Sequence, residues 1–387
     1  MNIDYKDFFK VNSKNLLLLI VIIVIFIILV YASSQTSLQT KNCTNITKSF
    51  PTTATYNISL MPDTVNSKKI SELYIKTAYN CCCSGKFKND YVDICALQNC
   101  ANYGVRALDF QIYKLNGKPI ISASTVNEIQ YKEIYNYLDF NDTMLQVNKM
   151  FITTSTNNTE PLFLIFRVYS KVKDTYDQMF TSLNSIFGSN SGSNNIIYLT
   201  NDLPNTTFSQ LKRKVIILVE YSCITTTYEA ECKTAFESSS LYKMSALHLN
   251  GSNNKVYRES ELIDGRISLN DFAIEFQKHK NYLDIIYPNV QINSYNYDFI
   301  TSGFYNGISF IGLNFQTKDT YLDLLNTADS LDTPPIINGF GGYAFKLKPD
   351  TTTVTNDVNT LITQFKDNIF AGNAILNNMV RDTSKDT

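Results

Sequence analysis

The hydrophobic pattern becomes regular from residue 74 onward, where short apolar runs alternate with amphipathic segments. Tyr74–Ala78 is an extended run, Asp90–Asn102 has the spacing of a helix, and Val105–Ile112 is typical of a buried strand. A polar hairpin and a short strand, Pro119–Ser122, follow. Strand, helix and strand in this order form the unit of a parallel sheet with crossover helices, so the pattern predicts an α/β fold.

The same alternation continues further along the chain. Pro161–Val168 and Val215–Glu220 are continuous apolar runs, as expected for strands that a parallel sheet buries on both faces. Tyr176–Ile186 lies between them and has the pattern of an amphipathic crossover helix. Tyr131–Tyr137 and Asp142–Met150 are also predicted to be helical.

An uncharged apolar run near the N-terminus, Leu16–Ala32, is about seventeen residues long, close to the minimum for a membrane-spanning helix. Lys6, Lys10 and Lys14 precede it, and the positive-inside rule places them in the cytoplasm. The sequence therefore predicts a single-pass type II membrane protein whose bulk lies on the lumenal, extracellular or virion-surface side. The alternative is a cleaved signal peptide with Val30-Tyr31-Ala32 at the cleavage site.

The charge balance excludes one class of partner. The 387 residues include 34 Lys and Arg and 35 Asp and Glu, so the formal net charge of −1 gives no electrostatic case for binding nucleic acid. The only histidines are His248 and His279, which limits any mechanism that needs a pair of imidazoles. His279 stands in the run Gln-Lys-His-Lys and is expected on a solvated helix face.

All eight cysteines follow the apolar run, and an even number on the non-cytoplasmic side favours disulfides. Cys95 and Cys100 lie on one predicted helix, so each is expected to pair with the Cys81–Cys83 loop rather than with the other. A zinc site formed by these cysteines is the alternative, although the chain has no Cys-x-x-Cys pair. The sequence leaves the connectivity open.

Seven Asn-x-Ser/Thr sequons occur, which is about the number expected by chance in a chain so rich in Asn, Ser and Thr. They are compatible with a glycoprotein without being evidence for one. The sequons lie at Asn42, Asn45, Asn57, Asn141, Asn157, Asn205 and Asn250.

Three short motifs in the first half of the chain carry a resemblance. They are Ala78-Tyr79-Asn80, Gly104-Val105-Arg106-Ala107-Leu108-Asp109 and Ala123-Ser124-Thr125-Val126. In the X region of phosphoinositide-specific phospholipase C, the corresponding motifs read Ser-His-Asn, Gly-x-Arg-x-(Val/Leu)-acid and Gly-His-Thr-Leu. The chain resembles this family in the frame of its motifs and differs from it at both histidines.

The second half resembles the Y region of the same family. Four motifs occur in the family's order: Ile286-Tyr287-Pro288, Asn293-Ser294-Tyr295-Asn296-Tyr297, a run over 307–317 that ends in Asn-Phe-Gln-Thr, and a run over 342–349 that ends in Leu-Lys-Pro. The family reads Ile-Tyr-Pro, Ser-Ser-Asn-Tyr, Ala-Leu-Asn-Phe-Gln-Thr and Gly-Tyr-x-Leu-Lys-Pro. The resemblance covers roughly residues 72–350 and implies a distorted (β/α)₈ TIM barrel with its site at the carboxyl ends of the strands.

This resemblance divides the chain into expected segments. In order, they are a cytoplasmic tail (1–14), a transmembrane signal anchor (15–32), a stalk (33–71), an X-like half-barrel (72–222), a linker (223–270), a Y-like half-barrel (271–350) and a C-terminal tail (351–387) with a helix over Asn356–Phe370.

The resemblance also implies that the acid–base groups are missing. Cleavage of a phosphodiester by the neighbouring inositol hydroxyl needs a base, an acid and positive charge near the phosphate. The two family histidines correspond to Tyr79 and Ser124. A phenol and a hydroxyl do not perform this work at neutral pH without strong tuning. No catalytic residue is therefore predicted, and the chain is expected to be a pseudoenzyme.

The family's calcium ligands, in order Asn, Glu, Asp and Glu, correspond to Asn80, Asp109, Gln111 and Arg167. Asn80 and Asp109 are the residual metal positions, and calcium is expected only if the protein is active, because such a site needs several anionic oxygens. We hypothesise that Arg167 pairs with Asp109 and fills the metal position. Asn80 could alternatively cap the turn after the first strand.

Of the two residues by which the family recognises the inositol phosphate head group, one is retained. The family reads Arg-Ile-Tyr-Pro, where the tyrosine stacks on the inositol ring and the arginine binds a phosphate. Tyr287 matches the tyrosine and Ile285 replaces the arginine. Tyr287 is therefore either an aromatic residue that packs the barrel rim or, together with Arg167, a contact for an inositol phosphate.

These expectations lead to one main interpretation: a membrane-anchored phospholipase C-like pseudoenzyme that binds or scaffolds a partner, either a phosphoinositide head group or another protein. The first alternative is an active phosphoric diester hydrolase with a rebuilt site. The second is a module that binds inositol phosphates or glycans. The Asn-, Ile- and Tyr-rich composition without Trp is typical of an AT-rich genome and is compatible with a membrane protein of a large DNA virus.

Overall fold

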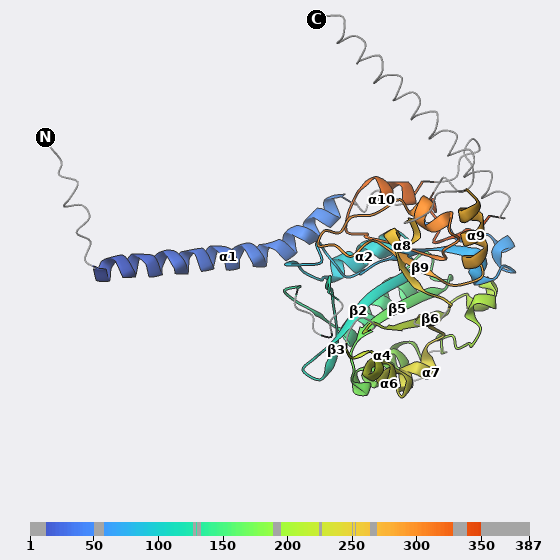
Figure 1. Cartoon of the computed structure of the whole chain (residues 1–387), viewed down its shortest axis with the longest axis horizontal. Coiled ribbons are helices and arrows are strands. Elements are labelled where there is room, and N and C mark those ends of the chain that lie inside the picture. Colours follow the sequence, from blue (N-terminus) through green and yellow to red (C-terminus); the bar gives the residue numbers. More distant parts are fainter. Residues whose placement is uncertain are drawn as a thin grey trace, which may run out of the picture.

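The fold is taken from a computed structural model (Figure 1), which describes residues 13–49, 58–126, 129, 133–188, 195–223, 227–249, 251, 253–263, 269–327 and 339–349. The predicted helix over Asn356–Phe370 and most of the predicted cytoplasmic tail lie outside the described residues.

Eight parallel strands form the centre of the molecule. In sheet order they are β7 (Leu247–His248), β6 (Val215–Tyr221), β5 (Leu162–Tyr169), β2 (Ala107–Leu115), β1 (Leu73–Ala78), β10 (Phe310–Leu313), β9 (Ile285–Tyr287) and β8 (Val256–Arg258). The apolar runs predicted as strands in the first half of the chain are therefore confirmed, as is the α/β class.

The sheet is curled into a barrel, as contacts between distant strands show. Strands β5 and β9 are four positions apart in the sheet, so in a flat sheet they would be separated by about 19 Å. Yet the guanidinium carbon of Arg167 on β5 lies 5.2 Å from the ring centre of Tyr287 on β9. Lower in the barrel, the rings of Phe163 and Phe310 meet at 5.3 Å. The interior is therefore filled by side chains from opposite walls.

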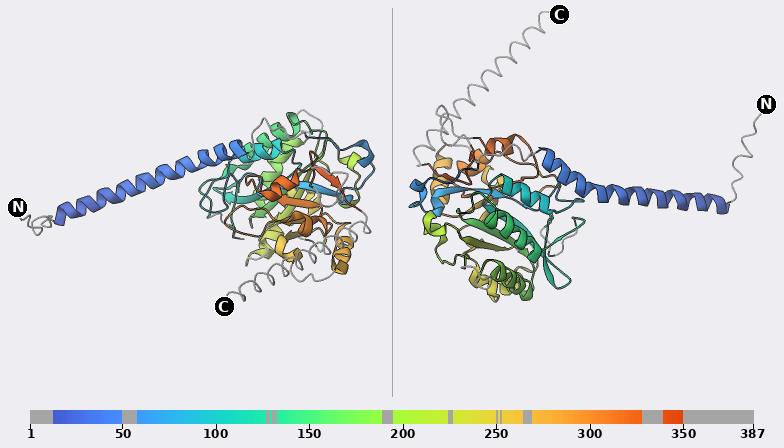
Figure 2. Two further views of the ribbon diagram at one scale, coloured as in Figure 1. Left: turned by 90° about the horizontal axis from the view of Figure 1, so that it is seen from above. Right: turned by 180° about the vertical axis from the view of Figure 1, so that it is seen from behind.

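Helices cover the outside of this barrel (Figures 1 and 2). The crossover helices α2 and α4 and the helix α3 confirm three predicted helices, because apolar residues at helical spacing face the sheet. The helices are α2 (Ile94–Asn102), α3 (Phe140–Val147), α4 (Lys173–Phe187), α5 (Phe208–Leu211), α6 (Glu229–Glu237), α7 (Ser240–Met244), α8 (Glu259–Ile263), α9 (Leu269–His279) and α10 (Thr320–Leu325), with π-helical turns at Asn148–Thr153 and Ile300–Phe304.

Three short strands add to the barrel. β3 (Lys118–Ser122) forms an antiparallel hairpin with β2, as predicted, and pairs on its other side with β4 (Leu138–Asp139). β11 (Phe345–Leu347) pairs antiparallel with the first half of β1. The ring of Phe345 contacts those of Phe163 and Phe208. β11 therefore fills the lower part of the seam between β1 and β2.

The predicted stalk differs from the structure. A single helix, α1 (Ser13–Ser49), contains the apolar run and continues well beyond it. Its last turns pack on α2 and bury Ile46. Residues 58–72 lie against the barrel, where Val65 and Ile70 are buried. The polar composition of residues 35–49 concealed a helix that is stabilised by contacts with the barrel rather than by its own sequence.

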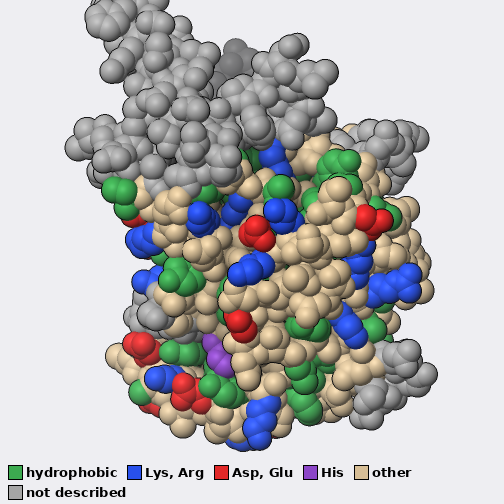
Figure 3. Space-filling view, turned by 90° about the vertical axis from the view of Figure 1, so that its right-hand side faces the viewer, with side chains coloured by type: hydrophobic (Ala, Val, Ile, Leu, Met, Phe, Trp, Pro, Cys, Tyr) green, Lys and Arg blue, Asp and Glu red, His purple; other side chains and the backbone are tan. Residues whose placement is uncertain are grey.

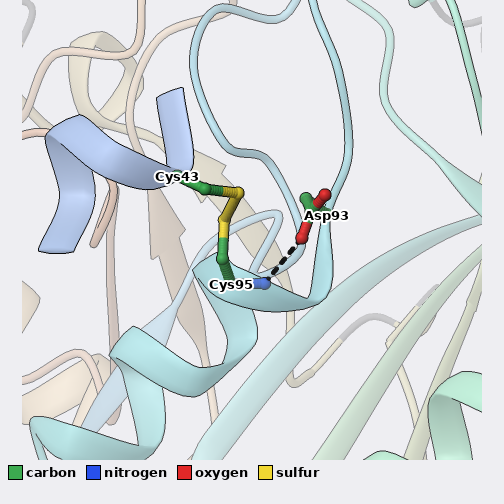
Figure 4. A group of neighbouring side chains, drawn as sticks. All are labelled: Cys43, Asp93 and Cys95. Carbon is green, nitrogen blue, oxygen red and sulfur yellow. Dashed lines mark hydrogen bonds between the residues drawn. A yellow bond between two sulfur atoms is a disulfide. The ribbon is translucent and has the colours of Figure 1, made fainter. Parts of the chain in front are cut away.

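Two disulfides connect Cys43 with Cys95 (Figure 4) and Cys223 with Cys232. The predicted pairing of Cys95 and Cys100 with the triple-cysteine loop is therefore wrong. Cys81, Cys82, Cys83 and Cys100 are buried free thiols. Cys95 and Cys100 both lie on α2, where the Cys95 side chain points outward to Cys43 of α1 and the Cys100 side chain is buried in the core.

The structure also gives no support to a zinc site. Among the described residues, the single set of three metal-ligand side chains that lie within reach of one ion is Cys43, Asp93 and Cys95. The two sulfurs of this set are bonded to each other and so are not available as thiolates. Asp93 instead caps α2 by accepting a hydrogen bond from the Cys95 amide at 2.9 Å (Figure 4).

Two further predictions are corrected. The segment 223–270, expected to be a linker, supplies the barrel strands β7 and β8. Each is only two or three residues long, too short to show a period in sequence. In the segment expected to be a helix over Tyr131–Tyr137, residues 133–135 form bends and residues 136–137 have no regular secondary structure. The sequon at Asn157 is fully buried, and its amide donates to the Gly104 carbonyl, so this side chain has no access for a glycan in the folded protein.

The cysteine arrangement gives a first prediction. Unfolding the chain without a reductant should expose four alkylatable thiols, because the other four cysteines are paired. In the native protein the same thiols should resist alkylation, since all four are buried. Mass spectrometry of the alkylated and digested chain checks both statements. A peptide in which Cys100 is crosslinked to Cys82 would contradict the arrangement.

Candidate active site

The candidate site lies at the carboxyl ends of the parallel strands. Successive side chains of a strand point to opposite faces, so one residue in two faces the barrel interior. Near the end of the barrel, the register places Gln111 on β2, Arg167 on β5 and Glu220 on β6 side by side. We call this end of the barrel the mouth.

A buried ion pair occupies the centre of the mouth. Arg167 donates from Nε to Oδ1 of Asp109 and from Nη2 to Oδ2, each at 2.7 Å. Both side chains are almost completely buried, with exposed fractions of 2% and 0%. The hypothesised pairing of these two residues is confirmed. Two parallel hydrogen bonds of this kind are the strongest geometry available to an arginine and a carboxylate.

Two further donors complete the shell of Asp109. The hydroxyl of Tyr287 donates to Oδ1 and the backbone amide of Asn80 donates to Oδ2, both at 2.9 Å. A carboxylate offers about four lone-pair directions, and all of those of Asp109 are engaged. The side-chain oxygen of Asn80 accepts from Arg167 Nη2 at 2.6 Å. The residual metal positions, Asn80 and Asp109, are thus bound to the arginine.

Asn80 makes these contacts from a left-handed conformation, with φ of 45°. Asn adopts this region more readily than most residues, so it suits the sharp turn after β1. The turn presents its backbone amide to Asp109 and its side-chain oxygen to Arg167. The alternative role, in which the side chain caps the turn, is not what the structure shows.

Aromatic rings enclose the guanidinium of Arg167. The ring centres of Tyr79 and Tyr287 lie 4.8 Å and 5.2 Å from its central carbon, and the two rings lie 4.6 Å apart. Arg258 at the end of β8 covers them, since its Nη1 donates to the Tyr79 hydroxyl at 3.1 Å and to the Pro288 carbonyl at 3.0 Å. Cation–π contacts of this kind strengthen when the groups are desolvated.

Ser124 lies beside this cluster and is joined to it through Gln111. The backbone amide of Ser124 donates to Oε1 of Gln111 at 2.7 Å. Its hydroxyl donates at 2.9 Å to Glu133, which also accepts from the amide and hydroxyl of Thr125. Lys88 contacts the same carboxylate at 3.0 Å. The serine at the second histidine position therefore anchors a loop.

Burial and neighbours set the protonation states in the mouth. Burial alone would lower the pKa of Arg167, but the adjacent Asp109 raises it well above the ordinary value. Burial raises the pKa of Tyr287, and the negative charge of Asp109 raises it further, so the phenol remains a donor. Burial also raises the pKa of Glu220, against the opposing effect of Arg167. In the centre of the mouth, Arg167 is therefore charged and the Tyr287 phenol is neutral.

The described residues pack closely beneath the ion pair. The gap beneath the ion pair, lined by Asn80, Cys82, Cys83 and Asp109 among others, cannot hold a water molecule. A larger hollow of about 390 Å³ lies on the outside of the barrel, between α4 and α7. Two donors in the mouth, Asn80 Nδ2 and Arg167 Nη1, are buried without a hydrogen-bond partner among the described residues.

Sequence reasoning missed three residues of this region. Arg258 lay in the expected linker, Glu220 ended a strand without an assigned role, and Glu133 lay in a segment expected to be helical. Only Glu220 carried a usable signal, because a carboxylate at the end of an otherwise apolar parallel strand lies at the end where sites form. The structure brings Tyr79, Asn80, Asp109, Arg167 and Tyr287 into direct contact.

The histidines lie elsewhere. His279 is buried, with Nδ1 2.5 Å from Asp284 and Nε2 2.9 Å from Glu275, so the prediction of a solvated helix face is wrong. The His279 ring points toward Asp284, which immediately precedes β9. Its other nitrogen meets Glu275, which lies one turn earlier on α9. His248 on β7 packs against the rings of Phe236 and Tyr242.

The ion pair gives a second prediction. Arg167→Met should lower the free energy of unfolding by about 3–5 kcal/mol, because it leaves Asp109 charged and buried without its partner. Lys173→Met is the matched control, since Lys173 pairs with Asp177 at the surface and such pairs contribute about 1 kcal/mol or less. Urea unfolding followed by circular dichroism measures both variants. Equal effects of the two substitutions would show that the buried pair contributes little.

Glu133 gives a third prediction, on pH dependence. Although its partial burial favours the neutral acid, hydrogen bonds from Thr125 lower the pKa of Glu133 from 4.5 to about 2. A carboxylate with a lowered pKa stabilises the fold above its ordinary value and loses this effect as the pH falls toward the folded value. The stability difference between wild type and Glu133→Gln should therefore be full at neutral pH and vanish near pH 2. The exposed Glu237→Gln serves as the control in the same titration, and a difference for Glu133→Gln that is independent of pH would contradict the assignment.

The sequence matches no protein-family model and no curated protein. Among solved structures, the chain is similar to PLC21 from L. pealei, with a TM-score of 0.52 and 18% identity over 73% of this chain and 38% of that chain. PLC21 from S. officinalis gives a TM-score of 0.51 and 17% identity over 73% and 37% of the two chains.

A calcium-dependent phosphoinositol-specific phospholipase C from a Gram-negative Pseudomonas sp. gives a TM-score of 0.41 and 11% identity over 76% of this chain and 99% of that chain. The present chain spans less than two fifths of the length of either PLC21. At these identities the similarity concerns the fold. The protein has an α/β fold with a curled sheet of eight parallel strands, like the barrel of phospholipase C catalytic domains.

Proposed function

We propose that this chain is a membrane-anchored protein with a phospholipase C-like barrel that has lost catalysis and serves in binding or scaffolding. The observation that supports it most is the Arg167–Asp109 pair in the mouth, enclosed by Tyr79 and Tyr287. An internal cation stands where the resemblance implies a metal ion, and an aromatic ring stands where it implies a histidine.

The state of Asp109 supports the loss of calcium binding. A calcium ion needs six to eight oxygen ligands, several of them anionic. Asp109 already accepts four hydrogen bonds, and the side-chain oxygen of Asn80 accepts one from Arg167. A metal ion would have to displace a guanidinium that is buried and bidentate, at a cost of several kcal/mol.

The proposed location rests on two features. The apolar stretch of α1 is long enough to cross a membrane, and the disulfides fit a secretory or membrane route. We propose that Leu16–Ala32 remains as a type II anchor with the barrel on the non-cytoplasmic side. A signal peptide passes the same test of length and composition, and the mass of the mature chain distinguishes the two.

One observation favours a binding module for inositol phosphates as the second candidate. Asn80 Nδ2 and Arg167 Nη1 are buried donors without hydrogen-bond partners among the described residues. Such groups are costly to bury and are satisfied by acceptor oxygens such as those of a phosphate or hydroxyl. Arg258, which is only partly buried at the rim, would supply a further positive charge. Access for a ligand requires Tyr79 to move, since its ring covers Arg167.

A cleavage assay tests the proposal. Full-length protein in mixed micelles of detergent and phosphatidylinositol should release no inositol phosphate above a protein-free blank, with calcium or with a chelator. Tyr79→Phe serves as the matched variant, because it keeps the ring and removes the hydroxyl that accepts from Arg258. It should give the same zero rate.

The outcomes separate the candidates. Turnover by the wild type that is lost in Arg167→Ala would overturn the pseudoenzyme and indicate an active phosphodiesterase with a rebuilt site. Saturable calorimetric binding of inositol 1-phosphate without turnover would favour the binding module. The absence of both would leave a scaffold for another protein.

A further inference from the structure

The anchor helix α1 is attached to the barrel by a series of contacts, which we call the clamp. Figures 1 and 2 show α1 projecting from one end of the molecule. The clamp is continuous over three turns of the helix and includes one covalent bond. In order along α1, its contacts join Tyr31 to Tyr135 at 3.3 Å, Gln39 to Asp93 at 2.6 Å, Asn42 to Asp90 at 2.5 Å and Cys43 to Cys95 by the disulfide.

The order of these contacts gives the direction of α1. Three of the clamp residues of the barrel, Asp90, Asp93 and Cys95, lie in the loop between β1 and α2 or in the first turn of α2. This loop is at the mouth because β1 ends there, and Tyr135 lies in the connection between β3 and β4. At the other end of α2, Ile58 packs against Gly104, which precedes β2. The end of α1 thus lies beside the mouth, and Ile58 lies at the opposite end of α2. Its apolar stretch, which comes before the clamp, therefore extends beyond the mouth.

We infer that the clamp holds the mouth of the barrel against the bilayer that its own anchor spans. The inference rests on the proposed function in one respect, namely that Leu16–Ala32 is retained as a membrane anchor. The partner of the mouth is then the lipid surface on the non-cytoplasmic side. The covalent bond between Cys43 and Cys95 makes this orientation a fixed property of the chain.

The distances along α1 fit this arrangement. Tyr31 is the last residue but one of the apolar run, and tyrosines favour the boundary between lipid and water. Because a helix rises 1.5 Å per residue, Gln39 and its partner Asp93 lie only about 12 Å beyond Tyr31. Tyr135 touches Tyr31 directly, so its loop lies at the level of the membrane surface.

The rim of the mouth has the side chains that this position requires. Five exposed apolar or aromatic residues lie in loops near the carboxyl ends of the strands: Val126, Tyr135, Tyr137, Val290 and Ile292. Ile292 is held near the clamp loop, since its carbonyl accepts from the amide of Phe87 at 2.9 Å. The face away from the anchor is different: Figure 3 shows Lys and Arg scattered among polar groups and small separate hydrophobic areas.

Fluorescence quenching in vesicles tests the orientation. Ile292→Cys on the rim and Leu199→Cys near the start of β6, at the opposite end, have similar exposed fractions, 50% and 58%. Each full-length variant is labelled with an environment-sensitive fluorophore and reconstituted into phosphatidylcholine vesicles that contain spin-labelled lipid. The label at position 292 should be quenched at least about twofold, and the label at 199 should not be quenched. The unsubstituted protein controls for labelling of the native thiols.

The outcomes are separable from those of the cleavage assay. Protein that does not float with vesicles would overturn both the anchor and the orientation. Protein that floats but shows no quenching at either position would overturn the orientation and leave the anchor intact. A signal at position 292 that depends on the ratio of protein to lipid would indicate a second copy in place of the bilayer and would also overturn the inference.

The clamp itself is tested by removing the disulfide. Cys43→Ser with Cys95→Ser should reduce the quenching at position 292 while circular dichroism and flotation remain unchanged. If this double variant does not fold, Gln39→Ala with Asn42→Ala removes two hydrogen bonds to Asp93 and Asp90 and leaves the disulfide in place. The first double variant that folds should give weaker quenching. Unchanged quenching in it would show that the clamp does not set the orientation.

Discussion

The buried pair of Arg167 and Asp109 is the constraint on which the rest of the mouth depends. Two opposite charges removed from water are stable only if each finds nearly all of its hydrogen bonds within the protein. This requirement explains why Asn80 takes a left-handed turn, why the Tyr287 hydroxyl points inward and why rings cover the guanidinium. The centre of the mouth is therefore one electrostatic unit built from β2, β5, β9 and the turn after β1.

This unit also neutralises the buried charge of Asp109 from within the protein. Carboxylates that line an open cleft repel one another unless a cation lies between them. An internal cation neutralises their charge at the same place. Arg167 on β5 supplies this cation and binds both carboxylate oxygens of Asp109. Stability of the fold and chemistry of the site are thus separated, as expected when function is a property of sites rather than of folds.

The sequence predicted the barrel and the ion pair because both depend on long strands and on motifs with fixed order. The sequence did not predict the features that depend on contacts between segments far apart in the chain. The partner of Cys95 is 52 residues away, on a helix with no apolar pattern of its own after residue 32. Strands β7 and β8 are too short to show a period. His279 looked solvated because its neighbours in sequence are charged, and only the fold shows that it turns away from them.

The place of β1 in the sheet has a consequence for biosynthesis. Ile75 lies in register with Phe310, so the barrel cannot close until the last parallel strand has emerged from the ribosome. Contacts between such distant segments form slowly, and β1 presents an unpaired edge in the meantime. The bond between Cys43 and Cys95 needs only the first hundred residues and can form before closure. Chains truncated before residue 310 would keep an open strand edge and should be prone to aggregation.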